Sequence, residues 1–273
     1  MTAKFITIED PGAHGPWMVM VHGMSQNHKI FEAQVENFRQ RHPICLIDLP
    51  GHGLSADLPG PFGHAEMAAH VGDAIGAAGI EQCIYWGTHT GSALGLRLAG
   101  RDHGRDPDRD GGRFLALILE GVVLPGHIMP GVNAELQRAC DMARDHGMAM
   151  AARQWFAKAA WFAVIRSNPG PCRSDAHQAI IAEFGGAPWL YDGPPGQLVE
   201  PVDEAISALA RPVLFYNGEH DLAEFAATAD TLGGLLPTAQ RATIPGSGGF
   251  PAWEYPDRVN HLVADFLTAH NII

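Results

Sequence analysis

Residues 85–93 read Tyr85-Trp86-Gly87-Thr88-His89-Thr90-Gly91-Ser92-Ala93. They follow a buried, strand-like run at 83–86 and lead into a helix that is rich in small residues. The glycines at 87 and 91 permit a turn too tight for larger side chains. Such a strand–turn–helix lifts its central side chain above the carboxyl edge of a parallel sheet, where ligands bind in open α/β folds. The side chain lifted here is the imidazole of His89.

Strands and helices alternate on both sides of this turn. The last helix shows one apolar face, with leucine, valine and phenylalanine at helical spacing over 259–267. Between about residues 125 and 200 the alternation stops, and the segment is rich in Met, Trp and helix formers. We therefore expect an α/β core of residues 1–124 and 201–273 with a helical cap inserted at 125–200. Apolar or alternating runs predict strands at 4–8, 17–21, 44–48, 83–86, 114–119, 212–216 and 240–244.

The composition limits the kinds of partner. Among 273 residues, 30 are acidic and 18 basic, so the formal net charge is −12 and no basic face for nucleic acid is visible. No apolar run is long enough to span a membrane, and no secretory signal follows Met1. We expect a cytoplasmic protein with a small-molecule substrate and without a cofactor, metal, nucleic-acid or membrane partner. A homodimer is left open by the sequence.

Five motifs occur in one order and make the chain resemble a known family. Together they resemble the cap-bearing α/β-hydrolases related to MenH-type, lactonase-type and meta-cleavage hydrolases, whose turn has the pattern G-x-nucleophile-x-G. The resemblance covers residues 4–270. It implies a mostly parallel eight-stranded sheet with helices on both faces and a lid over the carboxyl edge. The motifs are Val21-His22-Gly23, Asp48-Leu49-Pro50-Gly51-His52-Gly53-Leu54-Ser55, the turn at 87–91, Gly218-x-x-Asp221, and the stretch 245–256.

The resemblance also implies roles for single residues. The backbone N–H groups of Met24 and Thr90 take the positions of the family's oxyanion hole, which stabilises negative charge on a reacting carbonyl oxygen. The acid of the family falls on Asp221, after the strand at 212–216. A second acid position that some members use, after the strand at 114–119, falls on Glu120.

Two positions depart from the family pattern. The nucleophile position holds His89, and the general-base position, five residues before Glu254, holds Gly249. The Ser–His–Asp triad therefore lacks its nucleophile and its base. In volume the two changes compensate, so we expect the ring of His89 to move into the space left at Gly249. The hypothesis is a His–acid dyad with His89 as general base and Asp221 or Glu120 as its partner.

Several functions fit such a dyad. One is activation of water for attack on an ester, lactone or thioester carbonyl. Another is proton abstraction from the substrate, which would lead to elimination, isomerisation, cyclisation, decarboxylation or cofactor-free oxygenation. A catalytically silent ligand-binding protein is a third alternative, and a metal bound by His22, His89 and a carboxylate is a fourth.

Aromatic residues of the predicted cap and polar residues near the oxyanion turn are candidates for substrate contacts. Most cap aromatics stand at helical spacing and belong to the cap's own core, but enough should face the sheet to form an apolar lid. A hydrophobic or aromatic substrate of moderate size is therefore expected. The candidates are His22, Ser25, Trp155, Trp161 and Trp189.

Overall fold

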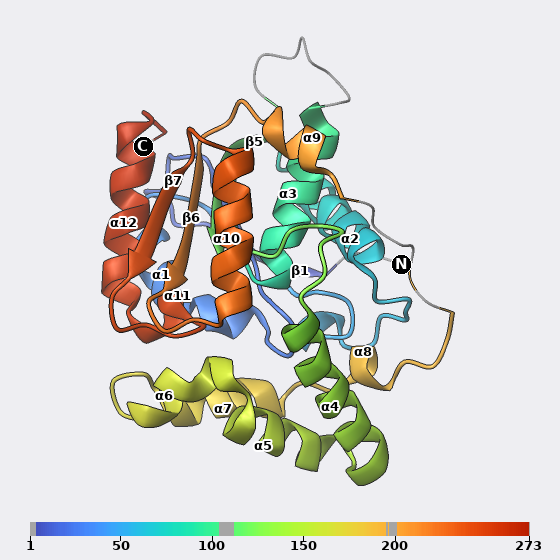
Figure 1. The fold of residues 1–273 in the computed structure, drawn as a ribbon. Helices are drawn as coiled ribbons and strands as arrows, with labels where there is room; N and C mark the ends of the chain where they lie inside the picture. Colours follow the sequence, from blue (N-terminus) through green and yellow to red (C-terminus); the bar gives the residue numbers. More distant parts are fainter. Residues whose placement is uncertain (1–3, 104–111, 195, 197–200, 273) are drawn as a thin grey trace.

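The computed structural model describes residues 4–103, 112–194, 196 and 201–272 (Figure 1). In this part of the chain, seven strands form one sheet in the order β1-β3-β2-β4-β5-β6-β7. The pairing of β1 with β3 is antiparallel, and the other pairings are parallel. The strands are β1 Phe5–Ile8, β2 Trp17–Val21, β3 Ile44–Ile47, β4 Cys83–Thr88, β5 Phe114–Glu120, β6 Val213–Gly218 and β7 Gln240–Ile244.

The expected count of eight strands is wrong for the described residues, which contain seven. Residues 9–16, between β1 and β2, form a turn rather than a further strand. This segment contains two prolines and two glycines. Proline cannot donate to a strand ladder and glycine weakens a strand interior, so the N-terminal part supplies a single strand that pairs with β3.

Helices cover both faces of the sheet, as predicted. Alternate strand side chains point to opposite faces, so Met20 and Trp86 belong to one apolar core and Val19 and Tyr85 to another. The first core includes residues of α1 and α12, and the second includes residues of α2, α3 and α10. These helices are α1 Glu32–Phe38, α2 His64–Ala77, α3 Thr90–His103, α10 Ala223–Leu235 and α12 Pro256–Ala269.

The chain between β5 and β6 folds into a helical segment, in which α4 to α7 lie together below the sheet in Figure 1. Its aromatic residues join the same core as Trp86 of β4. The division into a core and a cap at 125–200 remains a prediction, and residues 197–200 lie outside the described residues. The helices are α4 Pro130–His146, α5 Met148–Lys158, η3 Ala160–Phe162, α6 Ala163–Ser167, α7 Ser174–Ala182 and α8 Ala187–Leu190.

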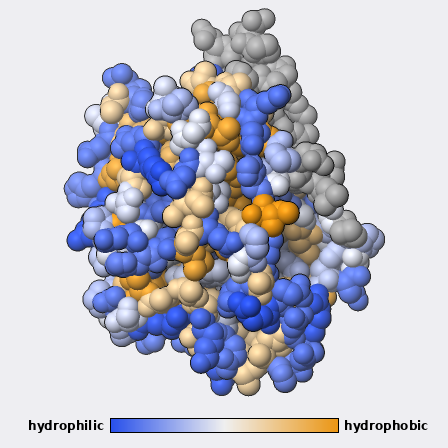
Figure 2. Space-filling view, in the orientation of Figure 1, coloured by the Kyte–Doolittle hydropathy of each residue, from blue (hydrophilic) through white to orange (hydrophobic). Residues whose placement is uncertain are grey.

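Shorter elements complete the described chain. Figure 2 shows mainly hydrophilic residues on the visible face, with apolar residues in small groups, as the charged composition leads one to expect. The large apolar side chains that are exposed are Leu54, Ile128, Met150 and Leu190. The shorter helices are η1 His28–Phe31, η2 Gly53–Ser55, α9 Asp203–Ser207 and α11 Pro251–Glu254.

The turn between β4 and α3 depends on close backbone approaches. A Cβ atom added at Gly87 would lie 2.4 Å from the carbonyl oxygen of Gly91, and one added at Gly91 would lie 2.2 Å from that of Val21. Neither site has room for a side chain. His89 has a φ of 49°, a left-handed conformation that residues other than glycine seldom adopt. The packing of α3 against β2 therefore holds His89 in a strained conformation at the carboxyl end of β4.

Replacing Gly91 by alanine tests this constraint. Because the added methyl would meet backbone, which cannot yield as a side chain does, we expect Gly91→Ala to lower the free energy of unfolding by about 2 kcal/mol or more. Gly76→Ala is the matched control, since nothing lies within 4 Å of a Cβ added there and the site is inside α2. Alanine should stabilise that helix by about 0.5–1 kcal/mol. Urea unfolding measures the stability of both variants. Equal unfolding midpoints would show that a methyl group at Gly91 meets no steric constraint.

Candidate functional site

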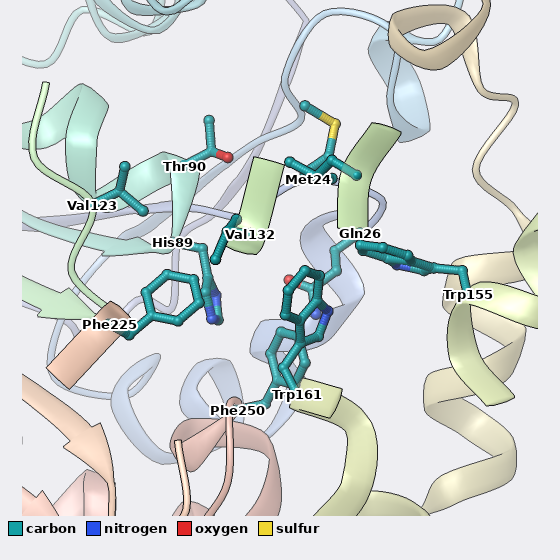
Figure 3. A pocket seen from close by; sticks show the side chains of 11 residues that line it. Met24, Gln26, His89, Thr90, Val123, Val132, Trp155, Trp161, Phe225 and Phe250 are labelled. Carbon is teal, nitrogen blue, oxygen red and sulfur yellow. The ribbon is translucent and has the colours of Figure 1, made fainter. Parts of the chain in front are cut away.

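A cavity of about 70 Å³ lies where His89 meets the helical segment (Figure 3). By the usual measure of one water per roughly 10–15 Å³ of such space, it holds a few waters or a small organic group. Its walls are mainly apolar, as is typical of small-molecule sites. The lining residues are Met24, Gln26, His89, Thr90, Val123, Val132, Leu136, Trp155, Trp161, Phe225 and Phe250.

The imidazole of His89 is packed between aromatic rings. Its centroid lies 5.2 Å from that of Phe225, edge-on, and 4.9 Å from that of Phe250. Both ring nitrogens are buried, and no side chain of the described residues bonds to either of them. Burial lowers the pKa of His89 to about 4, although a weak hydrogen bond with the backbone of Gly249 opposes this shift. The ring is therefore neutral at pH 7 and keeps one nitrogen lone pair.

The predicted pairing of His89 with a carboxylate is wrong, because no carboxylate of the described chain bonds to either His89 nitrogen. Asp221 accepts hydrogen bonds from Nδ2 of Asn217 at 2.9 Å and from the N–H of Leu222 at 2.8 Å. Burial raises the pKa of Asp221 to about 6. The structure therefore places this carboxyl group in its own loop after β6.

Glu120 likewise turns away from His89. Its Oε2 accepts a hydrogen bond from the N–H of Ala252 at 2.7 Å, and its carboxyl group also bonds to the hydroxyl of Tyr216. The Tyr216 oxygen accepts a hydrogen bond from Nε1 of Trp86 at 3.1 Å. Burial raises the pKa of Glu120 to about 8, so this group is mainly uncharged at neutral pH. Only backbone atoms join the two residues, through the His89 N–H and the Glu120 carbonyl oxygen at 2.8 Å.

The place that a side chain on Gly249 would take is filled by Trp161, whereas the His89 ring lies near the Gly249 backbone. A Cβ atom added at Gly249 would lie 2.6 Å from Cβ of Trp161 and 2.9 Å from its carbonyl oxygen. The His89 ring lies against Gly121, where an added Cβ would be 2.7 Å from Nε2. Trp161 comes from the helical segment, far from residue 249 in sequence. The local sequence around Gly249 therefore does not indicate that Trp161 packs there.

Met24 and Thr90 line the same cavity as His89. Among the described residues, neither backbone N–H donates a hydrogen bond. Thr90 is the first residue of α3, where N–H groups have no partner inside the helix. The action of these two N–H groups as an oxyanion hole remains a prediction.

Of the five candidates for substrate contact, Trp155 and Trp161 line the cavity. His22 is a buried brace: Nδ1 donates to the carbonyl of Gly23 at 2.7 Å, and Nε2 accepts from the N–H of Leu49 at 3.0 Å. Ser25 accepts a hydrogen bond from Nε1 of Trp155 at 2.9 Å. Trp189 packs edge-on against Trp155, with ring centroids 5.3 Å apart. His22, Ser25 and Trp189 therefore support the site from outside the cavity lining.

The sequence did not indicate Gln26 or His177. Gln26 lines the cavity and is 2% exposed, and its Nε2 lies 3.2 Å from Nε2 of His177. His177 lies on α7, fully buried, and burial lowers its pKa to about 3, with smaller contributions from Arg173 and His89. Gln26 stands two residues after Met24, which is a usable local signal. His177 is 151 positions away, so only folding brings it to the site.

Other binding features of the described residues are limited. In them, no group of three His, Cys, Asp or Glu side chains is arranged to hold a metal ion. No helix there combines the length and the apolar character that a membrane span requires. Cys45 and Cys83 are buried and form no disulfide bond within the described chain.

Comparison with known proteins agrees with this geometry. A family model described as alpha/beta hydrolase fold matches residues 16–139. The chain is 27% identical over 267 residues to the pimeloyl-[acyl-carrier protein] methyl ester esterase of Xanthomonas campestris, with 94% of this chain and 96% of the relative covered. It is 30% identical over 201 residues to the 2-succinyl-6-hydroxy-2,4-cyclohexadiene-1-carboxylate synthase of Yersinia pseudotuberculosis, with 64% and 66% covered.

The fold agrees with solved structures over almost the entire chain. MenH from S. aureus superposes with a TM-score of 0.80 at 18% identity, and 98% of each chain is covered. The family model, the sequence relatives and the solved structure agree with one another. The chain has the α/β-hydrolase fold.

Proposed function

We propose that this protein hydrolyses an ester, lactone or thioester of a small apolar or aromatic molecule, with His89 as general base. The observation that carries the proposal is a buried imidazole to which no side chain of the described chain bonds, in a cavity that Met24 and Thr90 also line. An unpaired buried polar group costs about 1–3 kcal/mol. A catalytic role is one of the few reasons why a native protein retains such a group.

The reaction uses the neutral form of His89. A nitrogen of the ring takes a proton from a water molecule while the water oxygen forms a bond to the carbonyl carbon. The carbonyl oxygen becomes negatively charged and accepts hydrogen bonds from the N–H groups of Met24 and Thr90. The bond from carbon to the leaving oxygen or sulfur then breaks, and the imidazolium returns the proton to the leaving group. The products are a carboxylic acid and an alcohol or thiol.

The aromatic lining of the cavity and the name of a sequence relative support an apolar or aromatic ester as the substrate class. Trp155, Trp161 and Phe250 provide aromatic surface on the side of the helical segment, which we infer to act as a lid. The Xanthomonas relative is named as a methyl ester esterase, which supports hydrolysis of an ester. Because both His89 nitrogens are buried, the lid must move for substrate and water to reach the ring.

A catalytically silent ligand-binding protein is the second candidate. It is favoured by one observation: no carboxylate of the described chain orients His89 or stabilises its protonated form. An imidazole without such a partner is a weaker base in the buried site, because burial disfavours its charged form. In this alternative the cavity binds an apolar small molecule and releases it unchanged.

Substitution of His89 separates the two candidates. We expect His89→Gln to lower kcat/KM for 4-nitrophenyl esters by about 100-fold or more, since general-base catalysis typically contributes 10²–10⁴-fold. His42→Gln is the matched control, because His42 is also buried and bonds to the carbonyl of Pro16, away from the cavity. Ser92→Ala excludes the neighbouring hydroxyl as a nucleophile. The activity should survive in both controls, and equal activity of His89→Gln and wild type would contradict the proposal.

The pH profile gives a second test. The pKa of about 4 for His89 means that the neutral base is present at all higher pH values, so kcat/KM should stay level from pH 7 to about pH 5 and halve near pH 4. Asp221→Asn removes the carboxyl group whose pKa is about 6 and should leave this midpoint in place. If kcat/KM instead fell with a midpoint near pH 6.5, and this midpoint disappeared in His89→Gln, the proposal of a buried base with a lowered pKa would be contradicted.

The same pKa affects stability. In the unfolded chain His89 takes up a proton near pH 6.5, but in the folded chain it does so only near pH 4. The unfolded state therefore binds more protons between these values, and the free energy of unfolding falls as the pH is lowered through this window. Circular dichroism at each pH confirms that the assay measures folded protein.

A further inference from the structure

We propose that the amide of Gln26 recognises the substrate and selects molecules that carry a hydroxyl or N–H donor near the reacting carbonyl. In this proposal His177 is a positioning residue, which orients the amide without touching the substrate. The inference rests on the proposed hydrolysis at His89 and specifies the substrate class for the same cavity.

The carboxamide of Gln26 has one atom without a partner. Gln26 lines the cavity and is 2% exposed, and its Oε1 is buried without a hydrogen bond in the described chain. In Figure 3 the side chain extends toward the cavity from the side opposite Phe225, and its oxygen lies on the side that faces His89 in this view. A buried carboxamide oxygen retains the capacity to accept two hydrogen bonds. A donor on a bound molecule would satisfy it.

His177 determines which end of the amide faces the cavity. Burial keeps this imidazole neutral at ordinary pH, so one ring nitrogen carries hydrogen and the other accepts. The amide nitrogen of Gln26 lies 3.2 Å from Nε2 of His177, and it donates to that atom in the tautomer that carries hydrogen on Nδ1. The nitrogen end is therefore engaged, and the oxygen end is left for the ligand.

Aromatic packing holds His177 in place. Its ring centroid lies 5.0 Å from that of Phe250 and 4.9 Å from that of Trp253, the latter nearly perpendicular. Phe162 lies 5.5 Å away on a third side. Because Phe250 also contacts His89, the two histidines pack against the same phenylalanine ring. The amide is thus oriented by a rigid group that belongs to the helical segment.

The apolar walls make this recognition selective. Trp155, Trp161 and Phe250 present mainly carbon surface to the cavity. In the proposed reaction the other polar groups of the lining, His89 and the N–H groups of Met24 and Thr90, bind the water and the reacting carbonyl, so Gln26 is left for a substrate hydroxyl. A site with a buried, unpaired acceptor discriminates against analogues that lack the donor. We expect a preference of about 10- to 100-fold in kcat/KM for the hydroxylated ester over its deoxy analogue.

The test compares three substituents at the same carbon. The probes are 4-nitrophenyl esters of butanoate with hydrogen, hydroxyl or methoxy at carbon 2 or carbon 3. The wild type should prefer hydroxyl by at least tenfold over both hydrogen and methoxy at one of these carbons. Equal rates for hydroxyl and methoxy would show that the amide donates instead of accepting, and no preference at either carbon would also overturn the proposal.

Variants connect the preference to the two residues. In Gln26→Leu and in Gln26→Met the hydroxyl-to-hydrogen ratio should fall below about threefold. His177→Phe preserves ring volume in the aromatic cluster but removes the acceptor, and the ratio should fall in the same way, while His177→Gln should restore part of it. A structural defect would lower all rates alike and leave the ratio unchanged. His42→Gln should keep the wild-type ratio, and a preserved ratio in both Gln26 variants would overturn the proposal.

Amide analogues separate this inference from the proposed hydrolysis. Calorimetry with butyramide and with its 2- and 3-hydroxy derivatives measures binding without turnover. Tighter binding of a hydroxy derivative by wild type, lost in Gln26→Leu, supports recognition by Gln26 even if no ester is hydrolysed. Ester hydrolysis without any hydroxyl preference, and equal binding of the amides, would leave the hydrolysis standing and refute the role of Gln26.

Discussion

The contact between the backbone of Gly91 and the carbonyl oxygen of Val21 is the constraint on which the site depends. The first turn of α3 meets the end of β2 so closely that a methyl group at Gly91 would lie 2.2 Å from that oxygen. This contact places the start of α3 directly above the sheet edge and gives His89 its left-handed backbone conformation. The N–H of Thr90 and the loop that carries Met24 meet at the same point, because β2 and β4 are neighbours in the sheet.

A large side chain at this position changes the packing around it. The imidazole of His89 fits because Gly121, after the adjacent strand, has no side chain and the rings of Phe225 and Phe250 form its other walls. Trp161 of the helical segment fills the place beside Gly249. Interiors are packed to near-crystal density, so each of these positions depends on the size of the others.

The same packing sets the chemistry. Burial keeps His89 neutral and Glu120 mainly protonated, while Asp221 bonds to its own loop. No carboxylate of the described chain bonds to His89, and the buried polar atoms to which no side chain of that part of the chain bonds include its ring nitrogens and Oε1 of Gln26. The proposed reaction relies on this neutral imidazole and on hydrogen bonds rather than on an ion pair.

The sequence alone determined the strands, the tight turn and the position of His89, because these depend on local patterns: apolar alternation, glycines at fixed spacing and a short motif. The resemblance to the family, rather than any local pattern, assigned Met24 and Thr90 to an oxyanion hole. Only the tertiary structure decided the partners of the side chains. Glu120 bonds to Ala252, Trp161 occupies the space at Gly249, and His177 reaches Gln26 across 151 positions. These contacts join distant segments through side-chain direction and volume, which no local pattern in the chain encodes.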